Sequence, residues 1–224
     1  MVSHFIAFFG PDGSGKSTHA ELLSNHLQSQ RVKVRKVWMR SPHTFAYLLS
    51  RFLVKIGFYR LILNPFGEGK KIPAVHVNRK FRLFWSITEL VSVIPVIILR
   101  IYIPLLLGYV VIAERCIVDT IVNIAYYTND AGFLQSRTAR LLLNLFPREA
   151  LLIHLDSDYK TLLRRRGRTV EAYSLIKFQR DCYKVMEKLL NATYINTSNH
   201  DINQISNLII NLVERKCKQV MRYD

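Results

Sequence analysis

Cysteine is scarce in this chain, which has three in 224 residues. Cys116, Cys182 and Cys217 are far apart, with no C-x-x-C pair and no histidine at the spacing of zinc ligands. This pattern argues against a disulfide framework or a metal cluster, and we expect a reducing, cytoplasmic location. A signal peptide is not expected, because the apolar run Phe5 to Phe9 is too short and ends directly in Gly-Pro-Asp-Gly.

Acidic residues are also few, since 16 Asp and Glu stand against 32 Lys and Arg, for a formal net charge of +16. Such a chain favours anionic partners, which include nucleotides, nucleic acid and acidic membrane surfaces, and charge alone does not choose among them. The sequence has no repeat, low-complexity tract or convincing linker, and 50% of its residues are hydrophobic. Length and composition predict a single domain over residues 1–224.

One long apolar stretch runs from Leu90 to Ala113, where only Arg100 is charged. Its length would allow ~20 apolar residues to cross a bilayer. Pro95, Pro104 and Arg100 argue against a span, and the stretch ends in a strand-like segment. We therefore expect a buried helix followed by a core strand, with a dimer interface or a membrane contact as the alternatives for residues 90–107.

Hydrophobic periodicity predicts strands that alternate with helices. The expected strands lie at residues 3–9, 31–39, 109–113, 150–155 and 194–196. The expected helices lie at residues 17–30, 44–63, 78–107 (interrupted near its prolines), 118–128, 135–145, 158–166, 170–190 and 201–216, with a loop at 70–73. This alternation predicts an α/β fold, an open parallel sheet of about five strands with helices on both faces.

The segment after the first expected strand carries a phosphate-binding motif. It reads Gly10-Pro11-Asp12-Gly13-Ser14-Gly15-Lys16-Ser17, followed by Thr18, and satisfies G-x-x-x-x-G-K-[ST] between an expected strand and an expected helix. Glycines let successive backbone N–H groups turn toward phosphate oxygens, and the following helix points its positive end at the same anion. We expect Lys16 to reach the β and γ phosphates of ATP and Ser17 to offer its hydroxyl to Mg²⁺. The whole P-loop, residues 10–18, is therefore the candidate cofactor-binding segment.

Two acidic positions accompany this motif. A carboxylate at Asp12 would repel a triphosphate unless it faces another ligand, so Asp12 indicates either a second site or a turn in which it bonds its own backbone. Glu114 and Arg115 follow an expected strand at the edge of the sheet where ligands bind. Glu114 is a candidate ligand of Mg²⁺ and Arg115 a candidate phosphate ligand, with a structural ion pair as the alternative.

The densest charge in the chain surrounds Gly167, in Arg164, Arg165, Arg166 and Arg168. Phosphoryl transfer places negative charge on the equatorial oxygens, so a mobile loop with arginines would exclude water and stabilise that charge. These four arginines are the candidate catalytic residues of a lid around residues 160–172. A solvated helix face and a nucleic-acid contact are the alternatives.

In these motifs the chain resembles the thymidylate kinase family of P-loop nucleoside monophosphate kinases. The resemblance covers residues 8–18 (FFGPDGSGKST), 104–115 (PLLLGYVVIAER) and 151–167 (LLIHLDSDYKTLLRRRG), in the order of the family. It implies transfer of the γ-phosphoryl group of ATP to dTMP with Mg²⁺, and Asp12 facing the sugar hydroxyl of the acceptor. Because Gly13 stands where some members carry an arginine, it implies a catalytic arginine from the lid. It also implies a homodimer packed through helices next to the sheet, and no nucleic-acid partner.

The chain departs from the family pattern where the acceptor is recognised. Residues 39–43 (MRSPH) keep one arginine and one proline of the family's Arg-Glu-Pro-Gly-Gly, which makes Arg40 the candidate ligand of the acceptor phosphate. Residues 85–89 (WSITE) lack the family's Asp-Arg pair, and Glu114 replaces the usual Asp. Four aromatic residues are candidates either for a base pocket or for the core, namely Trp38, Tyr47, Phe84 and Trp85.

Two other functions stay open. One is a kinase of the same fold that acts on a different phosphate or hydroxyl acceptor, including one at a membrane. The other is a nucleotide-dependent nucleic-acid-binding module, which the basic strand Arg31 to Lys36 and the net charge favour.

Overall fold

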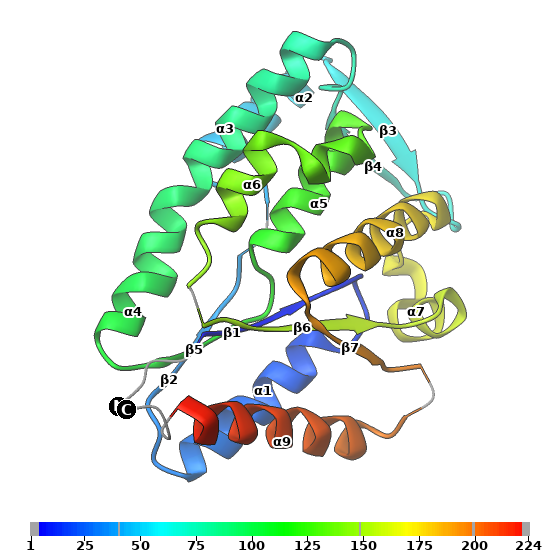
Figure 1. Cartoon of the computed structure of the whole chain (residues 1–224). Helices are drawn as coiled ribbons and strands as arrows, with labels where there is room; N and C mark the ends of the chain where they lie inside the picture. The colour runs from blue at the N-terminus through cyan, green and yellow to red at the C-terminus, as the bar shows by residue number, and fades with distance from the viewer. Residues whose placement is uncertain (1–4, 40, 148, 199, 221–224) are drawn as a thin grey trace.

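The structure is a computed structural model that describes residues 5–39, 41–147, 149–198 and 200–220, with side chains up to residue 216. A parallel sheet of five strands crosses the middle of the molecule (Figure 1). Its strand order is β2-β5-β1-β6-β7, and every neighbouring pair is parallel. The strands are β1 (Phe5–Phe9), β2 (Val34–Val37), β5 (Val110–Ala113), β6 (Leu151–Asp156) and β7 (Thr193–Asn196). The predicted α/β fold with an open parallel sheet is confirmed.

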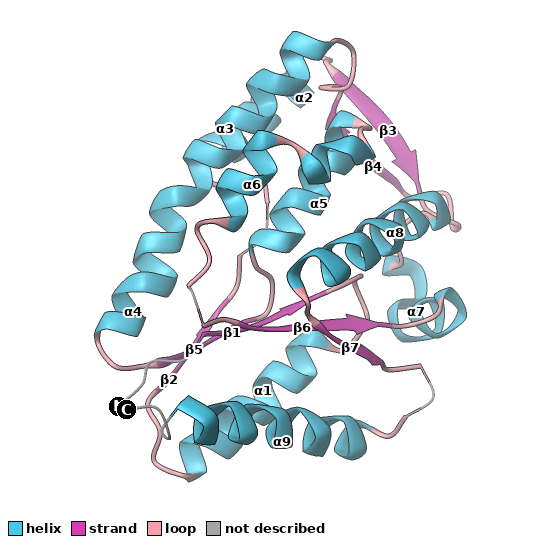
Figure 2. Cartoon of the chain, viewed as in Figure 1, coloured by secondary structure: helices cyan, strands magenta, loops and turns pink. Residues whose placement is uncertain are grey.

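Helices cover both faces of this sheet (Figures 1 and 2). On one face lie α1 (Lys16–Ser29) and α9 (Ile202–Val220), and on the other lie α3 (Arg79–Ile97), α5 (Ile117–Thr128) and α8 (Tyr173–Leu190). Successive side chains of a strand point to opposite faces. In β1, Phe5 and Phe9 pack with α3, α5 and α8, whereas Ile6 and Phe8 pack with α1 and α9. The strand is therefore a continuous apolar run because both of its faces are covered.

Further helices and helical turns connect these elements, and side-chain hydrogen bonds cap the starts of α3 and α7. These further elements are α2 (Thr44–Lys55), a π-helical turn (Ile98–Tyr102), α4 (Ile103–Leu106), 3₁₀ turns (Ala131–Gln135 and Gly167–Thr169), α6 (Arg137–Leu143) and α7 (Tyr159–Arg166). Asp158 caps α7 by accepting a hydrogen bond from the backbone N–H of Thr161 at 2.8 Å. Asn78 caps α3 in the same way through the N–H of Phe81 at 2.7 Å.

The helix predicted over residues 44–63 is wrong in its second half, and the loop predicted at 70–73 is also wrong. The helix α2 ends at Lys55, and Gly57 then adopts a φ of +85° that ends the helical path. An antiparallel hairpin follows, made of β3 (Tyr59–Leu63) and β4 (Gly69–Pro73). The apolar residues of β3 continue the helical periodicity of α2, although the turn residues 64–67 after them also fit a hairpin.

The helix predicted to be buried from residue 90 onward is buried on one side only. It runs as one continuous helix from Arg79 through the π-helical turn to Leu106. Its inner side carries fully buried residues, including Trp85, Val93 and Ile101, while Val91, Leu99 and Leu106 are exposed. By length and composition this helix could cross a membrane, since its most apolar window has a mean hydropathy of 2.1 and only 33% of that window is buried.

Candidate active site

The P-loop joins the end of β1 to the start of α1 and requires glycine at two positions. Gly10 and Gly13 have φ values of +139° and +91°, which L side chains rarely adopt. A Cβ at Gly10 would lie 2.0 Å from the carbonyl oxygen of Leu155, and one at Gly13 would lie 2.9 Å from Cγ of Arg166. Both the backbone conformation and the space around the loop therefore exclude larger residues.

Lys16, the first residue of α1, folds back into this loop. Its ammonium donates hydrogen bonds to the carbonyl oxygens of Gly10 at 2.8 Å and Pro11 at 2.7 Å, and its side chain is buried. This burial lowers the pKa of Lys16 to about 8, opposed in part by the negative charge of Asp119. Phosphate oxygens would be stronger partners for the ammonium than these carbonyl oxygens.

The hydroxyl of Ser14 is a second group that fits an anion in the loop. The residue is fully buried, and its Oγ has no hydrogen-bond partner among the described residues. A buried polar atom without a partner costs about 1–3 kcal/mol. An anion in the loop would give this hydroxyl an acceptor and remove that cost.

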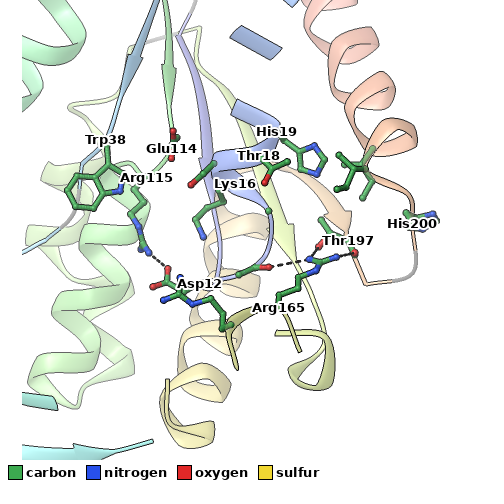
Figure 3. A pocket seen from close by; sticks show the side chains of 16 residues that line it. Asp12, Lys16, Thr18, His19, Trp38, Glu114, Arg115, Arg165, Thr197 and His200 are labelled. Carbon is green, nitrogen blue, oxygen red and sulfur yellow. Dashed lines mark hydrogen bonds and ion pairs between the residues drawn. The ribbon is translucent and has the colours of Figure 1, made fainter. Parts of the chain in front are cut away.

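A cavity of about 540 Å³ opens beside the loop (Figure 3). Its volume lies in the range of small-molecule sites. In Figure 3, Trp38 and Glu114 lie on one side of Lys16, and Thr197 and His200 lie on the other. The sequence-predicted residues that line the cavity are Asp12, Gly13, Gly15, Lys16, Ser17, Thr18, Glu114, Arg115, Arg165 and Arg166. Gly10, Pro11 and Ser14 belong to the loop but are not among the described residues that line the cavity.

Asp12 faces Arg115 across this cavity, and the two side chains form an ion pair (Figure 3). The guanidinium of Arg115 also lies 3.8 Å from a carboxylate oxygen of Asp119. Asp119 itself is held by the backbone N–H of Cys116 and the hydroxyl of Tyr183, each at 2.9 Å. The charge of Asp12 is therefore paired with a cation that a second carboxylate also contacts.

The four lid arginines differ in their surroundings. Arg165 donates hydrogen bonds to the carbonyl oxygen of Gly13 at 3.2 Å and to Oγ1 and the carbonyl oxygen of Thr197 at 2.9 Å and 2.6 Å. Arg166 packs over Gly13, and both arginines line the cavity. Arg164 and Arg168 are not among the described residues of its lining. The structure thus brings two of the four predicted arginines to the P-loop.

Oxygen ligands of the kind that Mg²⁺ prefers border the same cavity. The hydroxyl of Ser17 and the carboxylate of Glu114 both line it. Mg²⁺ in phosphoryl-transfer sites commonly takes one or two protein oxygens and completes its shell with phosphates and water. Ser17 and Glu114 fit this requirement. Among the described residues, no group of three or more His, Cys, Asp or Glu is placed to hold a metal ion.

A smaller polar cavity of about 30 Å³ shares Asp12 and Arg115 with the large one. Its lining also includes Ser41, Asn123 and Lys70, the last of which comes from the hairpin and lies 3.4 Å from Glu171. Arg40, the predicted ligand of the acceptor phosphate, lies outside the described residues.

The four candidate aromatic residues of a base pocket do not come together. Trp38 lines the large cavity, and Trp85 lies in the core with its ring 5.7 Å from that of Tyr127. Tyr47 and Phe84 are exposed, with 46% and 51% of their surface accessible. Of these four residues, Trp85 alone fits the alternative that the aromatic residues belong to the core.

A buried network lies behind Ser41, at the inner side of α3. Oε1 of Glu89 accepts a hydrogen bond from the Ser41 hydroxyl at 2.6 Å, and Oε2 lies 3.4 Å from the backbone N–H of His43. Burial raises the pKa of Glu89 to about 7, although these two hydrogen bonds act to lower it. Burial also lowers the pKa of His43 to about 4, and the charge of Arg100 lowers it further.

Two contacts near the site were missed from the sequence. Asp156, the last residue of β6, is almost fully buried and accepts two hydrogen bonds of 2.8 Å from Arg180 of α8. Thr197 follows β7, and its Oγ1 donates a hydrogen bond to the carbonyl oxygen of Ser14 at 3.1 Å. The same oxygen accepts a hydrogen bond from Arg165. The available signal was position, because both residues lie at the carboxyl ends of strands, where parallel sheets bind ligands.

A parallel sheet, a glycine-rich loop after its first strand and a buried lysine at the start of the next helix define a P-loop nucleotide-binding fold. Among solved structures, thymidylate kinase from Ehrlichia chaffeensis is similar, with a TM-score of 0.51 and 20% sequence identity. The similarity covers 96% of this chain and 100% of that chain. No protein-family model and no curated protein matches the sequence. The fold is therefore thymidylate kinase-like.

Proposed function

We propose that this chain is a nucleoside monophosphate kinase that transfers the γ-phosphoryl group of ATP to dTMP, giving ADP and dTDP. The observation that carries the proposal is the convergence of Lys16, Arg165 and Arg166 on one cavity beside the P-loop. Phosphoryl transfer depends mainly on positioning and charge neutralisation, and three cations around one loop supply both. The thymidylate kinase-like fold supports this choice of reaction.

The P-loop and Lys16 would hold the β and γ phosphates of ATP. Lys16 would exchange its bonds to the carbonyl oxygens of Gly10 and Pro11 for bonds to phosphate oxygens. Ser17 and Glu114 would hold Mg²⁺, which neutralises phosphate charge when it is bound. A phosphate oxygen of the acceptor forms the new bond to the γ-phosphorus, and the bond to the oxygen that bridges the β and γ phosphates breaks, so that ADP leaves.

Asp12, Arg115 and the lid would act on the acceptor side. In this proposal the ion pair between Asp12 and Arg115 opens when the acceptor binds. Arg115 then binds the acceptor phosphate, and the Asp12 carboxylate accepts a hydrogen bond from a hydroxyl of the acceptor sugar. Arg166 lines the large cavity and also a second cavity of about 290 Å³ between the lid and the hairpin. We assign Arg166 to the transferred phosphoryl group and Arg165 to positioning the loop.

The test is a coupled assay of ADP formation with ATP, Mg²⁺ and a panel of nucleoside monophosphates that includes dTMP, dUMP and UMP. Selective turnover with dTMP is expected, and Lys16→Ala should lower kcat by about a hundredfold or more while the far-UV circular dichroism spectrum stays unchanged. Full activity of Lys16→Ala would contradict the role of this lysine. ATP binding without turnover of any monophosphate would refute the choice of acceptor.

A second candidate is a kinase of this fold that acts on another phosphate or hydroxyl acceptor. It is favoured by the inner side of α3, where Trp85, Ser86 and Glu89 are buried and provide no cation for an acceptor phosphate. The cation that lines the smaller cavity from the hairpin is Lys70. Nucleotide binding that depends on Lys16, together with failure of the whole monophosphate panel, would support this candidate.

A further inference from the structure

The long helix Arg79–Leu106 buries three polar residues among its core residues and exposes large apolar residues on its outer side. Its buried side contains Ser86, Glu89 and Ser92, all at most 4% exposed. Its outer side carries large apolar residues, of which Phe84, Val91 and Leu99 are 51%, 53% and 64% exposed. Amphipathic surface helices normally bury the apolar side. The apolar outer side of this helix therefore needs an explanation other than the core.

The helix α2 extends this outer surface. Thr44 donates a hydrogen bond to the carbonyl oxygen of Ser92 at 2.9 Å, and the N–H of Ala46 donates to Oγ of Ser92 at 3.0 Å. These bonds fix the start of α2 against the middle of α3. Figure 1 shows the two helices together at the side of the molecule away from α1 and α9.

Exposed apolar side chains continue along α2 at helical spacing. They are Phe45, Leu48 and Phe52, which are 64%, 64% and 57% exposed. Together with Phe84, Val91 and Leu99 they form what we call the outer apolar face. Large exposed apolar side chains gathered on two adjoining helices are typical of an interaction site with a protein or a membrane.

The charges around the outer apolar face are almost all positive. Residues 44–107 contain nine Lys and Arg and two acidic residues, Glu68 and Glu89. Glu68 lies in the turn of the hairpin, and Glu89 is fully buried. The exposed cations on the two helices are Arg51 and Lys55 of α2, Arg79 and Lys80 at the start of α3, and Arg100.

We infer that the outer apolar face docks on the surface of an anionic lipid membrane. Apolar side chains would enter the boundary between headgroups and acyl chains, and the cations around them would meet the lipid phosphates. The helix would lie along the surface and would not span the bilayer. Its inner side packs in the core and holds Glu89 in hydrogen bonds to Ser41 and His43, which a span would have to break.

Charge also favours a membrane over a second copy of the chain. A symmetric dimer through this face would bring the same patch of each copy together. The exposed cations Arg51, Lys55 and Lys80 would then face residues of the same patch, and α2 and α3 carry no exposed acidic residue to pair with them. An anionic lipid surface supplies the missing negative charge.

The experiment is co-sedimentation of the full chain with vesicles of phosphatidylcholine alone and of phosphatidylcholine with about one third phosphatidylglycerol. The wild-type protein should bind the anionic vesicles, and binding should weaken as salt is added. The variant Phe84→Gln/Val91→Gln/Leu99→Gln should lose at least about tenfold in partitioning. The matched control is Val185→Gln/Leu189→Gln/Leu208→Gln, which changes exposed apolar residues of α8 and α9 and should bind like the wild type.

A second variant tests the charge directly. Arg51→Gln/Lys55→Gln/Lys80→Gln should weaken binding to the anionic vesicles by roughly a hundredfold at low salt. ATP binding serves as the folding check for every variant, so that loss of membrane binding is separated from failure of the proposed kinase activity. Wild-type protein that stays in the supernatant with both vesicles would overturn the inference. So would a dimer in sedimentation velocity that the apolar triple variant abolishes, in the absence of vesicle binding.

Discussion

Replacing Glu89 by glutamine should change how the stability of the protein depends on pH. Glu89 is fully buried at the inner side of α3, and burial raises its pKa from 4.5 to about 7 although the Ser41 hydroxyl and the N–H of His43 bond it. Well below pH 4.5 the carboxyl group is protonated in both the folded and the unfolded chain, so its ionisation does not affect the free energy of unfolding. As the pH rises toward 7, the unfolded chain releases this proton first, and the folded state loses stability.

The size of the effect follows from the two pKa values. A difference of one pKa unit corresponds to 1.36 kcal/mol, so the shift from 4.5 to about 7 amounts to about 3 kcal/mol of lost stability above pH 7. The pKa of His43, lowered from 6.5 to about 4, acts in the opposite direction, because stability falls as the pH drops through that range. Wild type and Glu89→Gln share His43, so its contribution largely cancels when the two proteins are compared at each pH.

The measurement is urea unfolding of both proteins at a series of pH values. Between about pH 5 and about pH 8, the free energy of unfolding of Glu89→Gln relative to wild type should rise by about 2–3 kcal/mol. A constant offset of about 1 kcal/mol is expected from the changed hydrogen bonds to Ser41 and His43. A difference between the two proteins that does not vary with pH would refute the reasoning.

Three further predictions test the geometry of the site, one of them with a matched control variant. Gly13→Ala should weaken ATP binding about tenfold in a titration, because φ is +91° and the new Cβ would lie 2.9 Å from Cγ of Arg166. Arg165→Ala should lower kcat by about a hundredfold, because it removes the hydrogen bonds that hold Gly13 of the P-loop and Thr197. The control Arg164→Ala should change kcat less than about threefold, and equal losses in the two variants would contradict the difference drawn between these arginines. Arg180→Leu should lower the free energy of unfolding by about 3 kcal/mol in urea, because it leaves Asp156 buried without its cation, and an unchanged midpoint would count against this contact.

The fold could be predicted from the sequence where local pattern and global role agree. The buried run Phe5–Phe9, the P-loop and the helix after it have one consistent interpretation, because covered strands are continuously apolar and glycine has few other reasons to recur at this spacing. The hairpin β3–β4 was missed because the short, mostly apolar strand β3 does not distinguish a strand from a helix by periodicity. The strand β4 (GKKIP) contains glycine, two lysines and proline, which indicate a loop.

The candidate site could be predicted only in part, because its side chains come from segments that are distant in sequence. The pairing of Asp12 with Arg115 spans 103 positions, and no local spacing indicates it. The choice of Arg165 and Arg166 over Arg164 and Arg168 depends on which side of a single helical turn faces Gly13. A run of like charges does not contain that information, since all four side chains are chemically equivalent until the helix is placed.

The inner and outer sides of α3 connect the proposed membrane surface to the proposed acceptor site. Glu89 on the inner side holds the hydroxyl of Ser41, and Ser41 lines the small polar cavity that also contains Asp12 and Arg115. The buried polar residues of this helix and its exposed apolar residues then have separate roles, because the inner side holds polar groups next to the proposed acceptor site and the outer side is the surface that we propose to dock on lipid.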